Sequence, residues 1–323
     1  MDNSDIARIS HFLLELYRNA QQMEPGRFQQ DMLQQLGQLL DFDYAVWGGA
    51  QAAERQITDL VVLNQSPELL IRWQEVGQQD SFCDLTLRHL NRSWMFDDVL
   101  NYRNTLAYNE HWRTFDVRHM ISTIMQEPMD GYVSFIGLCN VDPSRPFSEH
   151  ERQIKQLLMP HLSEALRLNR QQTLDLSTED NEGTALASPQ GWILASSAPF
   201  AALLQEEWGS AIRRLPATLF DDTATYGDWC GRRIIIQFRR FSGHLLLRAR
   251  PLTPLDRLSP RAQEVAQLYA GGLSHKEVAR QLGISPETVR KHLVRIYAQL
   301  GIASKASLAR LVSLGGRATK REF

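Results

Sequence analysis

The sequence predicts an α+β fold with an N-terminal antiparallel sheet flanked by helices, a smaller second module and a C-terminal segment of four short helices. Three observations predict it. Apolar residues recur at helical spacing over residues 6–20 and 27–40, and from Phe42 onward the pattern changes to β-rich runs. A polar, acidic run at residues 174–183 is typical of a linker. Residues 255–323 then carry repeated start and stop signals for short helices.

Residues 1–173 form the first expected domain. Its strands are expected at FDYAVWGGA, ITDLVVLN, 119–126 and 132–141, with a turn at Asp130-Gly131. Helices are expected from Ser66-Pro67 to about Gly77, near residues 105–115, and from the N-cap Ser148 onward. The stretch DSFCDLTLRHLNRSWMFDDV has no regular pattern. Helices around an antiparallel sheet resemble the GAF type of sensor fold.

Residues 184–250 form the second expected module. A hairpin turns at Pro189-Gln190-Gly191, a helix begins near Ala198, and two further strands turn near Ser242-Gly243. This order resembles the opening of a PAS module, although the segment is short for one. Pro251 and Pro254 bracket the hinge into the C-terminal segment.

Serine N-caps and glycine stops divide the C-terminal segment, residues 255–323, into four helices. Glu277 completes a capping box with Ser274, and Gly283 makes a tight turn because glycine takes left-handed dihedrals without penalty. Two short helices joined by such a turn are a helix-turn-helix, whose second helix normally enters the DNA major groove. The expected helices run from Ser259-Pro260 to Gly271-Gly272, from Ser274 to Leu282, from Ser285-Pro286 to Leu300, and from about Ser304 to Leu314.

The third of these helices has two unlike sides. At 100° per residue, one side is an apolar seam within an arc of about 60°, and the opposite side carries three cations and no acid. A charge run on an isolated helix is more often a solvated face. Here the caps, the Gly283 turn and the preceding helix favour a surface for a phosphate-lined groove. The seam is Val289, Leu293, Ile296 and Leu300, and the opposite side is Arg290, Lys291, Val294, Arg295 and Ala298.

The segment resembles the LuxR/GerE-type helix-turn-helix of bacterial transcription regulators, over roughly the last fifth of the chain. The resemblance lies in Ser259-x-Arg261, Gly272-x-Ser274-x-Lys276-Glu277-x-Ala279 and Ser285-x-x-Thr288-Val289-Arg290-x-His292. It implies base contacts from Arg290, Lys291 and Val294, and phosphate contacts from Lys276, Ser285, Thr288 and Arg295. The family usually has lysine in place of Arg290, which leaves the preferred base open.

The resemblance also implies a homodimer. The fourth helix of this family commonly pairs two copies on a two-fold axis, and here that helix presents Leu308, Leu311 and Val312. A dimer would place two half-sites about 34 Å apart, one turn of DNA.

The two ends of the chain have opposite net charges, although the net charge of the whole chain is only −2. Residues 255–323 contain 12 Lys and Arg against 5 Asp and Glu, a balance of +7, whereas residues 1–254 contain 23 against 32, a balance of −9. The C-terminal end therefore suits a polyanion. No apolar run reaches the roughly 18 residues that cross a bilayer, and the acidic start MDNSD is unlike a signal peptide, so we expect a cytoplasmic protein.

Motifs for catalysis are missing from the sequence. It contains no GxxxxGK[ST], HExxH or GxSxG, and Cys83, Cys139 and Cys230 are too widely spaced for a zinc ribbon. His111 and His119, eight residues apart, are more often structural than ligands. We therefore expect no enzyme, no cofactor and no metal.

Because catalytic motifs are missing, we expect the first domain to bind a ligand. Five aromatic residues could line an apolar pocket with Asp80 as a polar anchor, although each ring alone is more often core: Trp47, Trp73, Trp94, Trp112 and Tyr132. An acyl-homoserine lactone receptor is a lesser alternative. Asp80 and Trp94 are one residue short of that family's spacing, and the expected aromatic pair falls on Pro67 and Ile71.

The sequence as a whole predicts a dimeric transcription regulator whose first domain responds to a small molecule. Double-stranded DNA and a small-molecule effector are the expected partners, and RNA polymerase is a further one. We expect no association with a membrane. The alternative is an adaptor that acts through protein–protein contacts and uses the helix-turn-helix only to dimerise.

Overall fold

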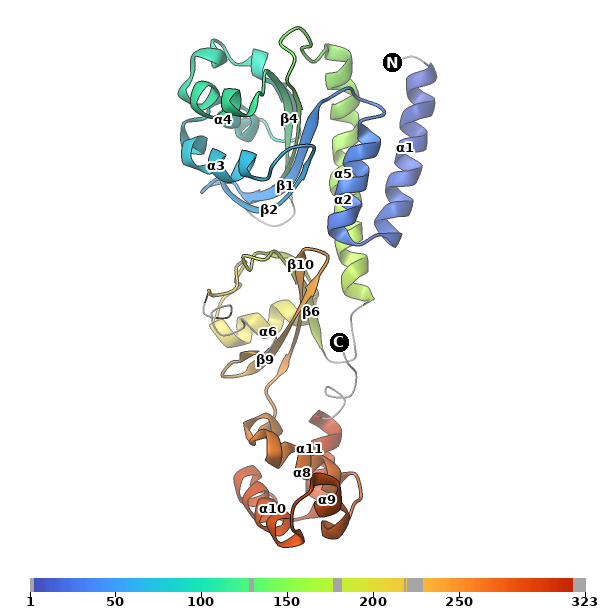
Figure 1. The fold of residues 1–323 in the computed structure, drawn as a ribbon, viewed down its shortest axis with the longest axis vertical. Helices are drawn as coiled ribbons and strands as arrows, with labels where there is room; N and C mark the ends of the chain where they lie inside the picture. The colour runs from blue at the N-terminus through green and yellow to red at the C-terminus, as the bar shows by residue number, and fades with distance from the viewer. Residues whose placement is uncertain (1–2, 128–130, 177–181, 218, 220–228, 316–323) are drawn as a thin grey trace. The chain divides into compact units, whose positions relative to one another are not determined.

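A computed structural model describes residues 3–127, 131–176, 182–217, 219 and 229–315 of the chain (Figure 1). The first domain is built on a five-stranded antiparallel sheet with the strand order β2-β1-β5-β4-β3. Its strands are β1 Tyr44–Gln51, β2 Gln56–Leu63, β3 Ser93–Met95, β4 His119–Gln126 and β5 Tyr132–Asn140. Its helices are α1 Asn3–Gln22, α2 Pro25–Leu36, α3 Glu68–Val76, α4 Ser81–Arg88 and α5 Glu149–Asp175.

Helices cover both faces of this sheet. Figure 1 shows α1, α2 and α5 on one face and α3 and α4 on the other. Side chains along β1 alternate between the two, since successive residues of a strand point to opposite faces. Ala45 and Trp47 belong to the core under α1, α2 and α5, whereas Tyr44 and Val46 belong to the core under α3 and α4. Both faces are therefore apolar, and the predicted α+β architecture is confirmed.

Two details of this domain differ from the sequence prediction. The helix expected near residues 105–115 is a π-helical turn, Ala107–His111, followed by a 3-10 turn, Trp112–Phe115. The stretch without a regular pattern contains α4, which the sequence reading missed. Asp80 caps this helix by accepting hydrogen bonds from the backbone of Phe82 and Cys83. The helix is only eight residues long, too short to show a helical period. Asp130, one half of the expected turn, lies outside the described residues.

The second sheet has the order β7-β6-β10-β9-β8, which repeats the connectivity of the first. Its strands are β6 Gly183–Ala187, β7 Ile193–Ser196, β8 Trp229–Cys230, β9 Ile234–Phe241 and β10 His244–Pro251, with helix α6 Ala198–Trp208 after β7. Strands β9 and β10 meet at the expected turn, where Ser242 and Gly243 both have positive φ. The linker expected at residues 174–183 is shorter than predicted, because α5 continues to Asp175 and β6 begins at Gly183. Residues 177–181 of this stretch lie outside the described part.

The C-terminal segment consists of helices α8 Pro260–Ala270, α9 His275–Leu282, α10 Pro286–Leu300 and α11 Lys305–Gly315, preceded by a 3-10 turn at Pro254–Arg257. Four apolar side chains at its centre, Val265, Val278, Val289 and Leu308, are fully buried. These helices therefore enclose a core of their own. In the part of the chain that the structure describes, no helix combines the length and apolarity needed to span a membrane.

Candidate nucleic-acid interface and sensor pocket

Local signals fix the geometry of α9 and α10. Ser274 and Ser285 cap the two helices by accepting hydrogen bonds from the backbone of Glu277 and Thr288. Gly283 ends α9 in the left-handed region at φ 65°, where a side chain would be strained. The chain therefore turns between the helices in three residues, as the sequence predicts.

Helix α10 turns its apolar seam inward and its cations outward. Val289, Leu293 and Ile296 are buried in the domain core. On the opposite side Val294 is 69% exposed, and Arg290, Lys291 and Arg295 are exposed as well. We call these four exposed residues the reading face. An apolar side chain left this exposed between cations suits contact with a thymine methyl group in a major groove.

The expected phosphate contacts lie beside this face. Lys276 is exposed in the first turn of α9. Ser285 and Thr288 hydrogen-bond to each other through their hydroxyl oxygens, 2.8 Å apart, at the N-terminus of α10. Backbone N–H groups and partial positive charge gather at a helix N-terminus, so this end of α10 is suited to an anion.

One acidic residue on the same side of α10 was missed by the sequence reading. Glu287 precedes Val289 by two residues, so it lies about 160° from the apolar seam. Its carboxylate is 3.5 Å from the Arg290 guanidinium, and both side chains are about two-thirds exposed, at 64% and 65%. Counting the helix back to its first turn would have revealed this acid.

The expected dimerisation residues of α11 have unlike environments. Leu308 is 0% exposed and belongs to the core of its own domain, so it has no surface to offer a second copy. Leu311 and Val312 are half-buried. Of the three predicted residues, Leu311 and Val312 are therefore the ones that keep exposed surface.

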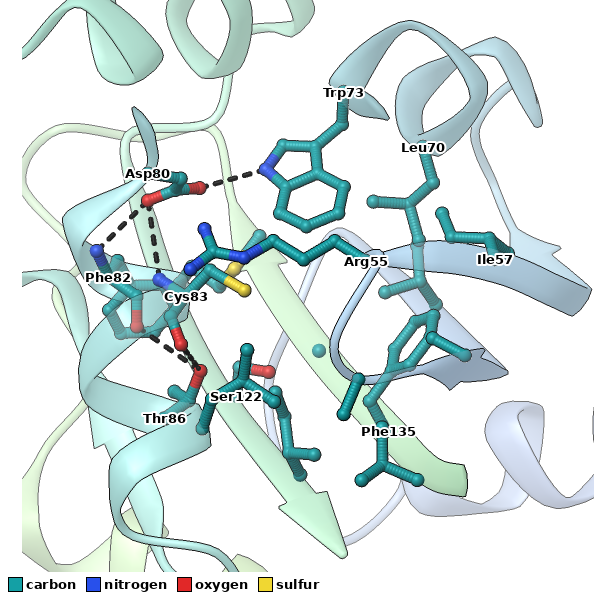
Figure 2. A pocket seen from close by; sticks show the side chains of 18 of the residues that line it. Arg55, Ile57, Leu70, Trp73, Asp80, Phe82, Cys83, Thr86, Ser122 and Phe135 are labelled. Carbon is teal, nitrogen blue, oxygen red and sulfur yellow. Dashed lines mark hydrogen bonds between the residues drawn. The ribbon is translucent and has the colours of Figure 1, made fainter. Parts of the chain in front are cut away.

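The first domain contains a pocket between the sheet and helices α3 and α4 (Figure 2). Its cavity volume is about 80 Å³. One water needs roughly 10–15 Å³ of cavity volume, so the cavity holds several water-sized groups. Most of the side chains around it are apolar, among them Ile57, Leu70, Trp73, Phe82 and Phe135.

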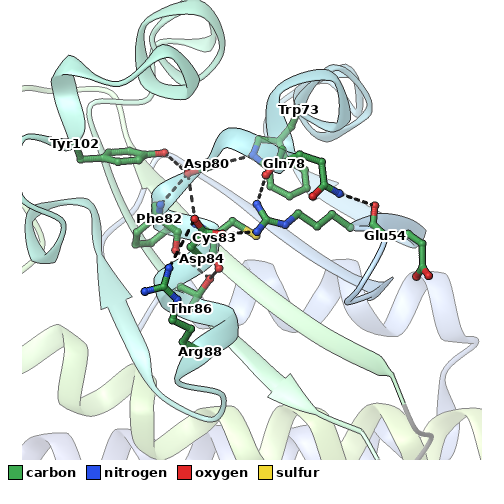
Figure 3. A network of polar contacts seen from close by, with 12 residues as sticks. Glu54, Trp73, Gln78, Asp80, Phe82, Cys83, Asp84, Thr86, Arg88 and Tyr102 are labelled. Carbon is green, nitrogen blue, oxygen red and sulfur yellow. Dashed lines mark hydrogen bonds and ion pairs between the residues drawn. The ribbon is translucent and has the colours of Figure 1, made fainter.

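Asp80 anchors one wall of this pocket through a network of hydrogen bonds (Figure 3). One oxygen accepts from the Trp73 and Trp112 indoles at 2.8 and 3.1 Å. The other accepts from the Tyr102 hydroxyl at 2.8 Å and from the backbone N–H groups of Phe82 and Cys83. A carboxylate has about four acceptor positions, so five donors saturate it. Asp80 therefore holds α3, α4 and the Tyr102 and Trp112 turns together.

Arg55 and Cys83 add polar atoms to the pocket wall. The Arg55 side chain extends past Trp73 (Figure 2), and its guanidinium donates to the Gly77 carbonyl and to Asp84. Burial raises the pKa of the Cys83 thiol to about 12, so this thiol stays protonated at neutral pH. With Arg55 paired and Cys83 neutral, the pocket offers little net charge to a ligand.

Of the six expected ligand-binding residues, Trp73, Asp80 and Trp112 line the pocket. Trp47 packs on Phe28 of α2, on the opposite face of the sheet, with ring centroids 6.1 Å apart. Trp94 is half-buried beside His89. Tyr132 donates to Asp59, which is ion-paired with Arg170 of α5, and it passes over Gly49, where a β-carbon would lie 1.9 Å from its hydroxyl oxygen.

His111 and His119 have different surroundings. His119 lies 3.0 Å from the Pro143 carbonyl oxygen through Nε2. His111 is buried against Trp112, and among the described residues its Nε2 has no hydrogen-bond partner. Burial lowers the pKa of His111 to about 4.

We predict that His111 makes the first domain sensitive to acid. The folded domain keeps His111 neutral down to about pH 4, whereas an unfolded chain takes up the proton near pH 6.5. Its contribution to stability is therefore complete above pH 6.5 and is lost as the pH falls toward 4. Urea midpoints measured from pH 7.5 to 5 should fall less steeply in His111→Gln than in the wild type. Equal slopes would contradict the prediction.

Taken together, α8 to α11 form a helix-turn-helix with an exposed basic reading face. Residues 256–312 match the family model of bacterial regulatory proteins, luxR family. An HTH-type transcriptional regulator of Mycobacterium bovis is 43% identical over 61 residues, which are 19% of this chain and 7% of that protein. UhpA, a transcriptional regulatory protein of Escherichia coli, is 40% identical over 55 residues, 17% of this chain and 28% of that protein. Residues 256–312 are a LuxR-family helix-turn-helix domain.

Solved structures also align with longer parts of the chain. Escherichia coli SdiA aligns over 95% of this chain and 97% of its own, with 14% identity and a TM-score of 0.38. An N-acylhomoserine lactone dependent LuxR family transcription factor from Burkholderia cenocepacia aligns over 50% of this chain and 94% of its own, with 15% identity and a TM-score of 0.40.

Proposed function

We propose that this chain is a sequence-specific DNA-binding transcription regulator, not an enzyme, that acts on DNA in the cytoplasm as a homodimer. The observation that carries the proposal is the reading face of α10, which holds three exposed cations and Val294 against a buried apolar seam. Phosphates and base edges of a major groove are the natural complement of such a helix. RNA polymerase is the further partner through which a bound regulator would act.

We propose that the first domain binds a small, uncharged and largely apolar effector. The small cavity beside Trp73 and Phe135 supports this class, because a charged molecule would have to leave water for an apolar wall. The saturated carboxylate of Asp80 supports it too, since no acceptor position is left for a ligand. A polar effector such as a lactone, held by Asp80, is less well supported.

The effector site and the DNA-binding domain would be joined through the segment between α5 and β6, the PAS-like module at 184–250 and the Pro251–Pro254 hinge. An effector shifts operator affinity only if it binds one arrangement of the DNA-binding modules more tightly than another. We therefore expect effector and operator to change each other's affinity by the same factor.

Filling the cavity should abolish effector binding. Ser122, on β4, lines the pocket, and a phenylalanine there would occupy the space. Gln126→Phe is a matched control, because Gln126 lies at the exposed end of the same strand. Native mass spectrometry of the purified full chain should find a bound small molecule in the wild type and in Gln126→Phe. Ser122→Phe should retain at least about tenfold less of that molecule. A molecule retained by Ser122→Phe, or found in none of the three, would refute the sensor proposal.

A further inference from the structure

We propose that Glu287 is a specificity-determining residue that accepts a hydrogen bond from the amino group of a cytosine, and that Arg290 donates to a guanine on the adjacent base pair. The inference rests on the proposed DNA-binding function and adds to it a base preference and the residue that sets it. Glu287 is acidic, so it cannot be one more phosphate contact on a basic helix.

The position of Glu287 points to the floor of the groove. It lies in the first turn of α10, and the N-terminal residues of a recognition helix are those that contact base edges. Around the helix it lies about 160° from the buried seam, between the directions of Arg290 and Lys291. Its side chain is 64% exposed, so it has no role in the domain core.

In a DNA groove the Glu287 carboxylate needs a hydrogen-bond donor. Binding would bring Glu287 between two rows of phosphates, and an acid there opposes binding unless it gains a hydrogen bond in return. In the major groove the donors are the N4 amino group of cytosine and the N6 amino group of adenine. Adenine also presents the N7 acceptor beside its amino group, which repels a carboxylate. Cytosine therefore remains as the base that Glu287 accepts from.

The ion pair between Glu287 and Arg290 indicates that the two residues contact successive base pairs. The Glu287 carboxylate is 3.5 Å from the guanidinium of Arg290, one helical turn further on. The 3.5 Å between the two side-chain ends is close to the roughly 3.4 Å between stacked base pairs. Arg290 can donate two parallel hydrogen bonds to guanine. The pair would thus read a guanine and a cytosine on successive base pairs, with the carboxylate holding the guanidinium in position.

The test compares the sequences that full-length variants select from a randomised duplex pool, followed by anisotropy titrations. The wild type should select a guanine next to a cytosine in each half-site and bind it at least about tenfold more tightly than a duplex lacking that cytosine. Glu287→Gln should prefer adenine at the cytosine position, because glutamine pairs with the N6 and N7 of adenine. Glu287→Ala should lose the preference at that position and keep the guanine.

Glu264→Gln is the matched control. Glu264 also pairs with an arginine three residues away, Arg261 at 2.6 Å, but on α8, off the reading face. Both glutamine variants remove one negative charge, but Glu264→Gln should still select the cytosine, whereas Glu287→Gln should not. A cytosine preference retained by Glu287→Ala, with unchanged thermal unfolding, overturns the inference. A wild type that selects no sequence at all overturns the proposed function itself.

Discussion

Arg290→Ala is expected to weaken binding to the preferred operator by about 1–3 kcal/mol, roughly 5- to 150-fold, and to relax the preference at one base position. The guanidinium is exposed on α10 and removed from the domain core, so its loss changes recognition and leaves folding intact. Anisotropy titrations against the preferred duplex and its single-base variants measure both effects.

Lys276→Ala is the companion variant. Lys276 lies on α9, beside the reading face, where its expected contact is a phosphate. Its loss should weaken binding to all duplexes alike and lower the dependence on salt by about one ion. If Arg290→Ala also weakened every duplex by the same factor, Arg290 would be a phosphate contact and its proposed reading of guanine would be wrong.

Asp80→Ala is expected to destabilise the first domain by about 3–5 kcal/mol. The carboxylate is 1% exposed and accepts from two indoles, a phenol and two backbone N–H groups. Alanine would leave these donors buried without an acceptor and remove the cap of α4. Urea unfolding of the full chain, followed by tryptophan fluorescence, reports this domain through Trp73 and Trp112.

Asp97→Ala provides the comparison for Asp80. Asp97 is half-exposed and pairs with Arg103 on the surface, an arrangement worth less than about 1 kcal/mol. The urea midpoint of the Asp97→Ala variant should stay close to that of the wild type. If the two variants lost the same stability, the network around Asp80 would not hold the domain together.

The C-terminal domain could be predicted from sequence because its signals are local. Serine caps, Gly283 and the 3.6-residue period act within a few residues of one another, and they gave the helices close to their observed bounds. The same period would have shown Glu287 beside Arg290. Glu287 was overlooked because it precedes Val289, where the predicted apolar seam begins.

The pocket could not be predicted because its parts come together only in the folded domain. Trp73, Tyr102 and Trp112 meet at Asp80 across 40 residues of chain, and nothing in their spacing indicates a common partner. Trp47 was grouped with Trp73 and Trp112 because all three are aromatic. A strand with two buried faces gives no alternation of polar and apolar residues, so the sequence could not tell that Trp47 faces α2.

The most direct test of the account is the affinity of the full chain for its selected duplex and for a scrambled duplex of the same composition, each measured across a salt series. The account predicts that both affinities fall steeply with salt and that the selected duplex binds at least about 10³-fold more tightly at physiological salt. Equal affinities for the two duplexes at every salt concentration would contradict it, and would instead support a helix-turn-helix used only to dimerise.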